Sequence, residues 1–225
     1  MNYGSLNKLV IEPIFEHEFE PSSYGFRQGP GCKDALREVD RHLKAGHYWV
    51  VDADLQSYFD TIPHASLLAK VSNRIADGAV LELVQRFLKQ DIMEDMKQWT
   101  PISGSPQGAV ISPLLANIYL HELDVEMREV GLVMVRYADD AVVLCRSREE
   151  AESALTRMRA WVSANGLTLH PDKTHVGDCR VEGQGFEFLG YRFEAGKRQV
   201  RKKSLMSLRD KIRAKTKRNE GNSIE

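Results

Sequence analysis

The sequence predicts an α+β fold in which antiparallel strands are backed by helices. The first observation is RYADDAVVLC at 136–145, which with the preceding LVMV places short apolar, β-rich runs on both sides of two adjacent aspartates, as in a hairpin with carboxylates at its turn. The second is the segment 112–127, in which apolar residues recur at helical spacing. Hairpin and helix in one chain indicate an antiparallel sheet with helices packed on it.

The other elements follow from the same patterns. Gly104, Pro106 and Gly108 predict a constrained glycine-proline turn before the helix of the second observation. That helix begins with Ser112 as N-cap and Pro113 in its first turn, and Gly131 is its expected C-terminal stop. Further helices are expected over roughly 32–45, 65–90 and 148–164, and strands near 48–54, 175–181, 186–194 and 198–201. A final amphipathic helix is expected in the basic tail.

Two groups of carboxylates stand out. Asp139 and Asp140 occupy the hairpin turn, where a pair of aspartates is often simply solvated. The apolar run 49–54, however, carries Asp52 and Asp54, and a buried carboxylate without a partner is costly. A divalent cation is one such partner, and carboxylates from two strand ends can hold two Mg²⁺ ions about 3.5 to 4 Å apart. The alternatives are an Arg partner for Asp54 and a helix-capping role for the nearby Asp60.

Six blocks, in this order, resemble the reverse transcriptases encoded by bacterial group II introns, also called intron maturases. The blocks are SYGFRQGPGCKDAL (23–36), DADLQSYFD (52–60), GSPQGAVISPLLANIYL (104–120), YADD (137–140), LTLHPDKT (167–174) and FEFLGYRF (186–193). Retron, diversity-generating and CRISPR-associated reverse transcriptases share much of this pattern and stay open as alternatives.

The resemblance implies the palm of a right-hand polymerase with truncated fingers and only the start of a thumb. We expect partial fingers over 1–47, the palm over 48–196 with 65–108 partly fingers, and the basic start of a thumb or maturase region over 197–225. The fingertip segment of the family is not matched, so we expect this chain alone to polymerise poorly or not at all.

The implied activity is RNA-directed DNA polymerisation, in which two Mg²⁺ ions assist transfer of a nucleotide from dNTP to a primer 3′-hydroxyl; Mn²⁺ is an alternative metal. Asp54, Asp139 and Asp140 are the implied catalytic residues and metal ligands. The resemblance further implies a nucleotide-binding group and a primer- and template-binding group. The first group is Phe59 or Tyr58 as the steric gate, Gln107, Lys173 and Arg27; the second is Tyr137, Gly190, Tyr191, Lys202 and Lys203.

Some of these residues have structural alternatives that the sequence leaves open. Arg27 could pair with a local glutamate instead of a phosphate, Tyr137 could belong to the core, and Lys173 could be a solvated turn residue. The implied partners are an RNA template, a DNA primer, dNTP and the intron RNA. The second functional hypothesis is an RNA-binding splicing cofactor whose palm is a scaffold.

Composition and charge agree with a nucleic-acid enzyme. The net charge is −1, yet residues 192–218 contain 12 Lys and Arg against two acidic residues. Such a segment favours contact with phosphates. The sequence contains no apolar run long enough to span a membrane and no secretion signal at its N-terminus, so we expect no membrane partner and a cytoplasmic location. Three cysteines without close pairing predict neither a disulfide framework nor a zinc cluster.

Overall fold

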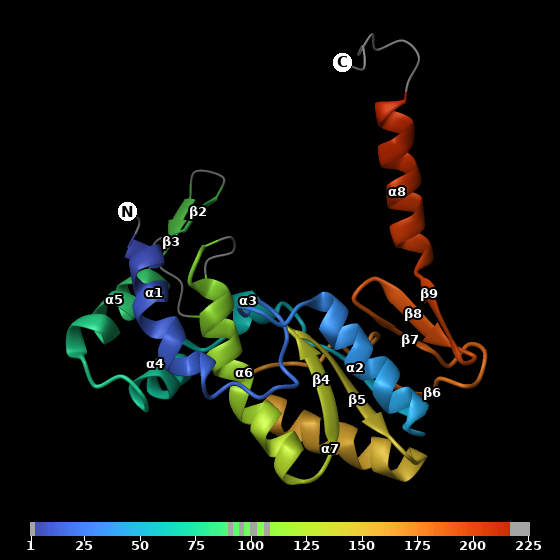
Figure 1. Ribbon diagram of the computed structural model, residues 1–225. Helices are drawn as coiled ribbons and strands as arrows, with labels where there is room; N and C mark the ends of the chain where they lie inside the picture. Colours follow the sequence, from blue (N-terminus) through green and yellow to red (C-terminus); the bar gives the residue numbers. More distant parts are fainter. Residues whose placement is uncertain (1–2, 90–91, 95–96, 100–102, 106–108, 217–225) are drawn as a thin grey trace.

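The core of the molecule is a four-stranded antiparallel sheet (Figure 1). The computed structural model describes residues 3–89, 92–94, 97–99, 103–105 and 109–216. The strands, in the spatial order β4-β5-β1-β6, are β4 (Val133–Tyr137), β5 (Asp140–Cys145), β1 (Trp49–Asp54) and β6 (His175–Asp178). This arrangement, with helices against the sheet, confirms the predicted α+β class.

One face of the sheet packs against helices α6 (Ser112–Glu129) and α7 (Arg148–Ala164). Because side chains alternate along a strand, Val51 and Ala53 of β1 and Val143 of β5 all point into this core. The same core extends into a helical subdomain beside α6. That subdomain consists of α1 (Tyr3–Glu16), α4 (His64–Ser72) and α5 (Gly78–Leu88), with the short α3 (Tyr58–Thr61) linking it to β1.

The opposite face of the sheet is covered by α2 (Cys32–Lys44) and a three-stranded sheet. This small sheet is formed by β7 (Phe186–Phe188), β8 (Tyr191–Glu194) and β9 (Lys197–Val200). Phe186 and Phe193 stack with ring centroids 4.8 Å apart, and they pack in one core with Val50 and Val142 of the large sheet. The small sheet is thereby docked on the face to which Asp52 and Asp54 also belong.

Two elements extend from this body (Figure 1). The hairpin of β2 (Ile92–Glu94) and β3 (Lys97–Trp99) follows α5, and α8 (Lys202–Lys215) projects away from the small sheet. No residue of α8 is buried. None of the helices in the described part of the chain is both long and apolar enough to cross a membrane.

The structure differs from the sequence prediction in several details, and the β2–β3 hairpin and the short α3 are among the elements that were not predicted. Helix α1 was not predicted, and it contains Pro13, a residue that usually interrupts helices. The strand region expected over 186–194 is a hairpin of two strands, as the family resemblance of FEFLGYRF implied, because Leu189 and Gly190 both have positive φ (49° and 83°) and form a turn. Ser112 lies inside α6, with Ile111 at the N-cap position.

Candidate active site

The carboxylates of the two predicted groups lie at one end of the large sheet. Strand β1 ends at Asp54, whose register partner is Asp140, the first residue of β5. Asp139 occupies the β4–β5 turn beside Ala138, which has a left-handed φ of 59°. Residues two apart on a strand share a face, so Asp52 lies on the same face as Asp54. The fold therefore brings Asp54 and Asp139, which are 85 positions apart in sequence, to the same end of the sheet.

Burial and the charges of neighbouring carboxylates disfavour the charged forms of Asp52, Asp139 and Asp140. Burial is the main cause that raises the pKa of Asp52 to about 6 and that of Asp140 to about 7. The charge of Asp54 raises both pKa values further, and that of Asp52 adds to the shift of Asp140. Burial likewise raises the pKa of Asp139, to which the charge of Asp54 adds. A divalent cation would relieve this repulsion, and carboxylate oxygens are the ligands that Mg²⁺ prefers. The donor set therefore fits Mg²⁺ chemically.

The side chains are not, however, arranged as a finished metal site. Among the residues that the structure describes, no three His, Cys, Asp or Glu side chains form a group that could hold a metal ion. Asp54 instead forms an ion pair with Lys173, whose Nζ lies 2.8 Å from Oδ2. Asp54 thus has a lysine partner where an arginine was the expected alternative. The joint role of Asp54, Asp139 and Asp140 as metal ligands stays a prediction.

The β7–β8 hairpin closes the site from the side of the small sheet. A backbone hydrogen bond from Glu187 stabilises the charged form of Asp52, and one from Leu189 does the same for Asp140. His175, the register partner of Asp52 on β6, also lowers its pKa. Sequence reasoning did not assign Asp52 to the site, although its spacing of two residues from Asp54 on a strand is the signal that places it there.

Phe59 and Tyr58, the two candidates for the steric gate, have different surroundings. Tyr58 is only 2% exposed, and its hydroxyl donates a hydrogen bond of 2.6 Å to the backbone oxygen of Ala116. Phe59 is half-buried and makes edge contacts with Phe26 and Tyr58. The ring of Tyr58 thus lies in the core, which favours Phe59 as the steric gate, and the nucleotide-binding roles of both residues stay predictions.

Arg27 is held by contacts within its own part of the chain. Its guanidinium pairs with Glu16 at 2.8 Å and donates hydrogen bonds to the backbone oxygens of Glu20 and Ser23. It also lies over the ring of Phe19, with 5.4 Å between the guanidinium carbon and the ring centroid. In this structure Arg27 therefore makes the local glutamate pairing that the sequence left open as an alternative, and its nucleotide-binding role stays a prediction.

Gln107 lies outside the described residues, but the turn that precedes it is fixed against α3. Gly104 has a φ of 90°, and a Cβ there would lie 2.9 Å from the backbone oxygen of Asp60. The backbone N–H groups of Gly104 and Ser105 bond to the oxygens of Ile62 and Phe59 at 2.8 and 2.7 Å. Gly104 and Ser105, the described residues of the predicted turn, are thereby attached to α3, the helix that carries Phe59; Pro106 and Gly108 lie outside the described residues.

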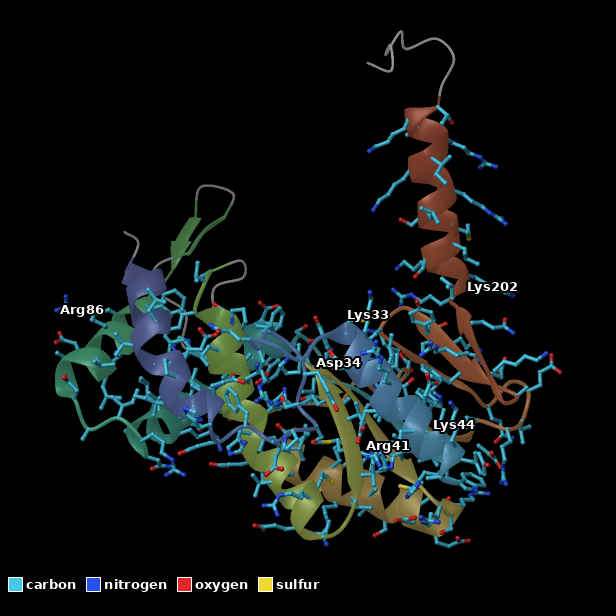
Figure 2. The ribbon with its side chains drawn as sticks, viewed as in Figure 1. Lys33, Asp34, Arg41, Lys44, Arg86 and Lys202 are labelled. Carbon is cyan, nitrogen blue, oxygen red and sulfur yellow. The ribbon has the colours of Figure 1, made fainter. Side chains whose placement is uncertain are left out.

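The residues predicted to contact primer and template lie at the end of β4, in the β7–β8 hairpin and at the start of α8. Tyr137 is half-buried at the end of β4 and packs against the core between the large sheet and α2. Gly190 is in the β7–β8 turn. Tyr191 carries the guanidinium of Arg198 over its ring at 5.3 Å. Lys202 and Lys203 are exposed at the start of α8, and Figure 2 shows Lys202 where that helix leaves the small sheet. Their contacts with nucleic acid stay predictions.

The fold is that of a polymerase palm, as its likeness to solved structures indicates. Telomerase from Candida albicans in complex with a fragment of telomeric RNA matches with a TM-score of 0.66 at 11% identity, covering 89% of this chain and 38% of that one. Apo telomerase from Candida tropicalis matches with a TM-score of 0.66 at 10% identity, covering 88% and 40%. At such identities the likeness concerns the fold alone, and it confirms the predicted architecture.

The chain belongs to the reverse transcriptase (RNA-dependent DNA polymerase) family, whose model matches residues 1–193. The group II intron-encoded protein LtrA of Lactococcus lactis subsp. cremoris is 40% identical over 117 residues, which is 52% of this chain and 19% of LtrA. An uncharacterised 91 kDa protein in the cob intron of Schizosaccharomyces pombe is 29% identical over 228 residues, 75% of this chain and 28% of that protein. The resemblance stated from the motifs is confirmed, and the chain spans less than a third of the length of either relative.

Proposed function

We propose that this chain is the palm, with part of the fingers, of a group II intron reverse transcriptase that extends a DNA primer on an RNA template. The observation that carries the proposal is the set of carboxylates at one strand end, where Asp54 is in register with Asp140 and Asp139 lies at the adjoining turn. A purely structural sheet end gains nothing from gathering mutually repelling, partly buried acids. A site that binds divalent cations does gain from them, because the carboxylates hold the cations and the cations in turn attract phosphate groups.

In the proposed reaction each side chain has a separate task. Asp54 and Asp139 would hold two Mg²⁺ ions, which when bound would acidify the primer 3′-hydroxyl and neutralise the triphosphate. Asp140 would be the third carboxylate of the metal site. Lys173, once released from Asp54, would donate a hydrogen bond or a proton to the triphosphate. Phe59 would occupy the volume that a 2′-hydroxyl needs, so that dNTP is preferred.

The proposed domain division assigns 1–47 to partial fingers, 48–196 to the palm and 197–225 to the start of the thumb. The basic α8 would follow the backbone of the primer–template duplex or of the intron RNA. That helix is also the observation that favours the alternative function, an RNA-binding splicing cofactor, because exposed cations on a projecting helix suit either role. A cytoplasmic location remains a prediction from the sequence.

The test uses both the 225-residue chain and a longer version flanked by the fingertip and thumb segments of a relative. The chain should bind Mn²⁺ in calorimetry, and the longer version should extend a primer on an RNA template with Mg²⁺. Asp139→Asn should abolish extension and weaken Mn²⁺ binding while the protein stays folded, whereas Glu152→Gln on the outer face of α7 should change neither. Extension that survives Asp139→Asn would refute the catalytic proposal, and RNA binding without extension would favour the splicing cofactor.

A further inference from the structure

A fully buried arginine lies directly behind the β4–β5 turn that carries Asp139. Arg136 on β4 is 1% exposed, and its guanidinium forms a two-point ion pair with Asp124 of α6, with N–O distances of 2.7 and 2.5 Å. The Asp124 side chain has no exposed surface. The charge of this arginine is therefore paired inside the protein and does not face any ligand.

The remaining guanidinium donors reach three other segments of the chain. Nη1 donates to the side-chain oxygen of Asn117 at 2.9 Å and to the backbone oxygen of Ala138 at 2.7 Å. Nη2 donates to the hydroxyl of Ser23 at 2.7 Å. One planar group thus joins α6, the loop before α2 and the turn that carries Asp139.

The loop at 22–25 is held against the same turn by its backbone. Arg136 donates its N–H to the oxygen of Ser22 at 3.0 Å and accepts one from Tyr24 at 2.8 Å. The amide of Asn117 donates to the oxygen of Gly25 at 2.7 Å. A Cβ on Gly25 would lie 2.1 Å from the backbone nitrogen of Ala138, so only glycine permits this approach.

Stability alone is a weak explanation for such a pair. Removing two charges from water costs about as much as their attraction returns, so well-packed apolar residues often replace a buried ion pair without loss of stability. The turn, in contrast, needs a constraint, since Ala138 holds a φ of 59° that residues with a Cβ adopt only when neighbours impose it. The Arg136 donor on the carbonyl of Ala138 is such a constraint.

We propose that Arg136 is a positioning residue, which fixes the Ala138 carbonyl and through it the orientation of Asp139, with Asn117 and Asp124 of α6 as its fixed supports. This inference rests on the proposed function, in that Asp139 is taken as a metal ligand. Residues that orient metal ligands typically change metal affinity or activity by about 10- to 100-fold when they are replaced. The helix that begins after the glycine-proline turn would in this way set the geometry of the carboxylate site.

The decisive variant is Arg136→Met combined with Asp124→Leu, which removes both buried charges and keeps apolar volume. Its matched control is Arg148→Met with Glu152→Leu, an exposed pair on α7 at 2.8 Å. We expect the first variant to be folded and to keep a cooperative unfolding transition. Hydrogen exchange in the segment 133–145 should accelerate at least about tenfold, and the affinity for Mn²⁺ should fall about 10- to 100-fold. The control should change neither quantity.

Arg136→Lys serves if the double variant does not fold, because lysine keeps a positive charge beside Asp124 but lacks the planar fork. It should also accelerate exchange in the segment and weaken Mn²⁺ binding. Exchange and Mn²⁺ affinity equal to those of the parent, in either folded variant, would overturn the inference. If the parent binds no Mn²⁺ the proposed function fails instead, and the exchange measurement still decides whether Arg136 constrains the turn.

Discussion

Replacing Asp140 by asparagine should stabilise the metal-free protein at alkaline pH. The pKa of Asp140 is about 7 in the folded protein, against an ordinary value of 3.8. A folded-state pKa above the unfolded one means that the folded protein binds the proton more tightly, so stability is complete below about pH 4 and is lost as the pH rises towards 7. A shift of about three units corresponds to at most about 4 kcal/mol.

The expected gain is smaller than this upper bound. Asp140 is partly exposed, so solvent screens its charge, and part of the shift in its pKa comes from the charge of Asp52, whose own pKa is also raised. We therefore expect Asp140→Asn to raise the free energy of unfolding by about 2 kcal/mol at pH 8, which is roughly 4 to 8 °C in Tm for a chain of this size. Asparagine keeps an oxygen that can accept the Leu189 hydrogen bond.

The assay is thermal unfolding followed by circular dichroism, in EDTA, at pH 5 and pH 8. The gain should be large at pH 8 and should shrink at pH 5, where the wild-type carboxyl is already largely protonated. Asp172→Asn, on an exposed turn nearby, is the matched control and should have no such effect. A stabilisation that is absent at pH 8, or equal at both pH values, would show that burial of this carboxylate does not govern the local energetics.

Three further changes test other parts of the molecule. In the longer version, Phe59→Ala should raise ribonucleotide relative to deoxynucleotide incorporation, and unchanged sugar selectivity would remove Phe59 as the gate. Tyr58→Phe should lower the free energy of unfolding by about 1 to 2 kcal/mol in denaturant titration, since it leaves the Ala116 oxygen without its donor, and selectivity should not change. Deleting 197–225 should make the affinity for a duplex less dependent on salt concentration. Each neutralised phosphate adds about 0.9 to the slope of log affinity against log salt concentration for B-DNA. An unchanged slope would mean that other residues contact the phosphates.

The sequence predicted those parts of the fold that depend on local pattern. The hairpin around Asp139, the strand that ends at Asp54 and the helix after the glycine-proline turn were all predicted, because alternation and helical spacing are visible in a single chain. Helix α1 was missed because its proline argues locally against a helix that tertiary packing supports.

The candidate site was predictable to the extent that its residues lie in motifs. Asp54 and Asp140 were both named, but their register and the Lys173 ion pair follow from strand pairing across the whole chain. The distinct environments of Phe59 and Tyr58 depend on which ring faces α6, a choice that spacing leaves ambiguous to one residue. The Arg136 network escaped detection because its partners are up to 113 residues away in sequence.

The ion pair between Lys173 and Asp54 has a consequence for the order of events at the site. An ammonium group and a divalent ion cannot occupy the same carboxylate oxygen, so the two compete for Asp54. Without metal the protein supplies its own counterion, which offsets part of the repulsion at the strand end. If a metal displaced it, as in the proposed function, the freed ammonium would lie beside the carboxylates, where a triphosphate would need a positive charge. Metal loading and nucleotide capture would then be successive uses of one lysine.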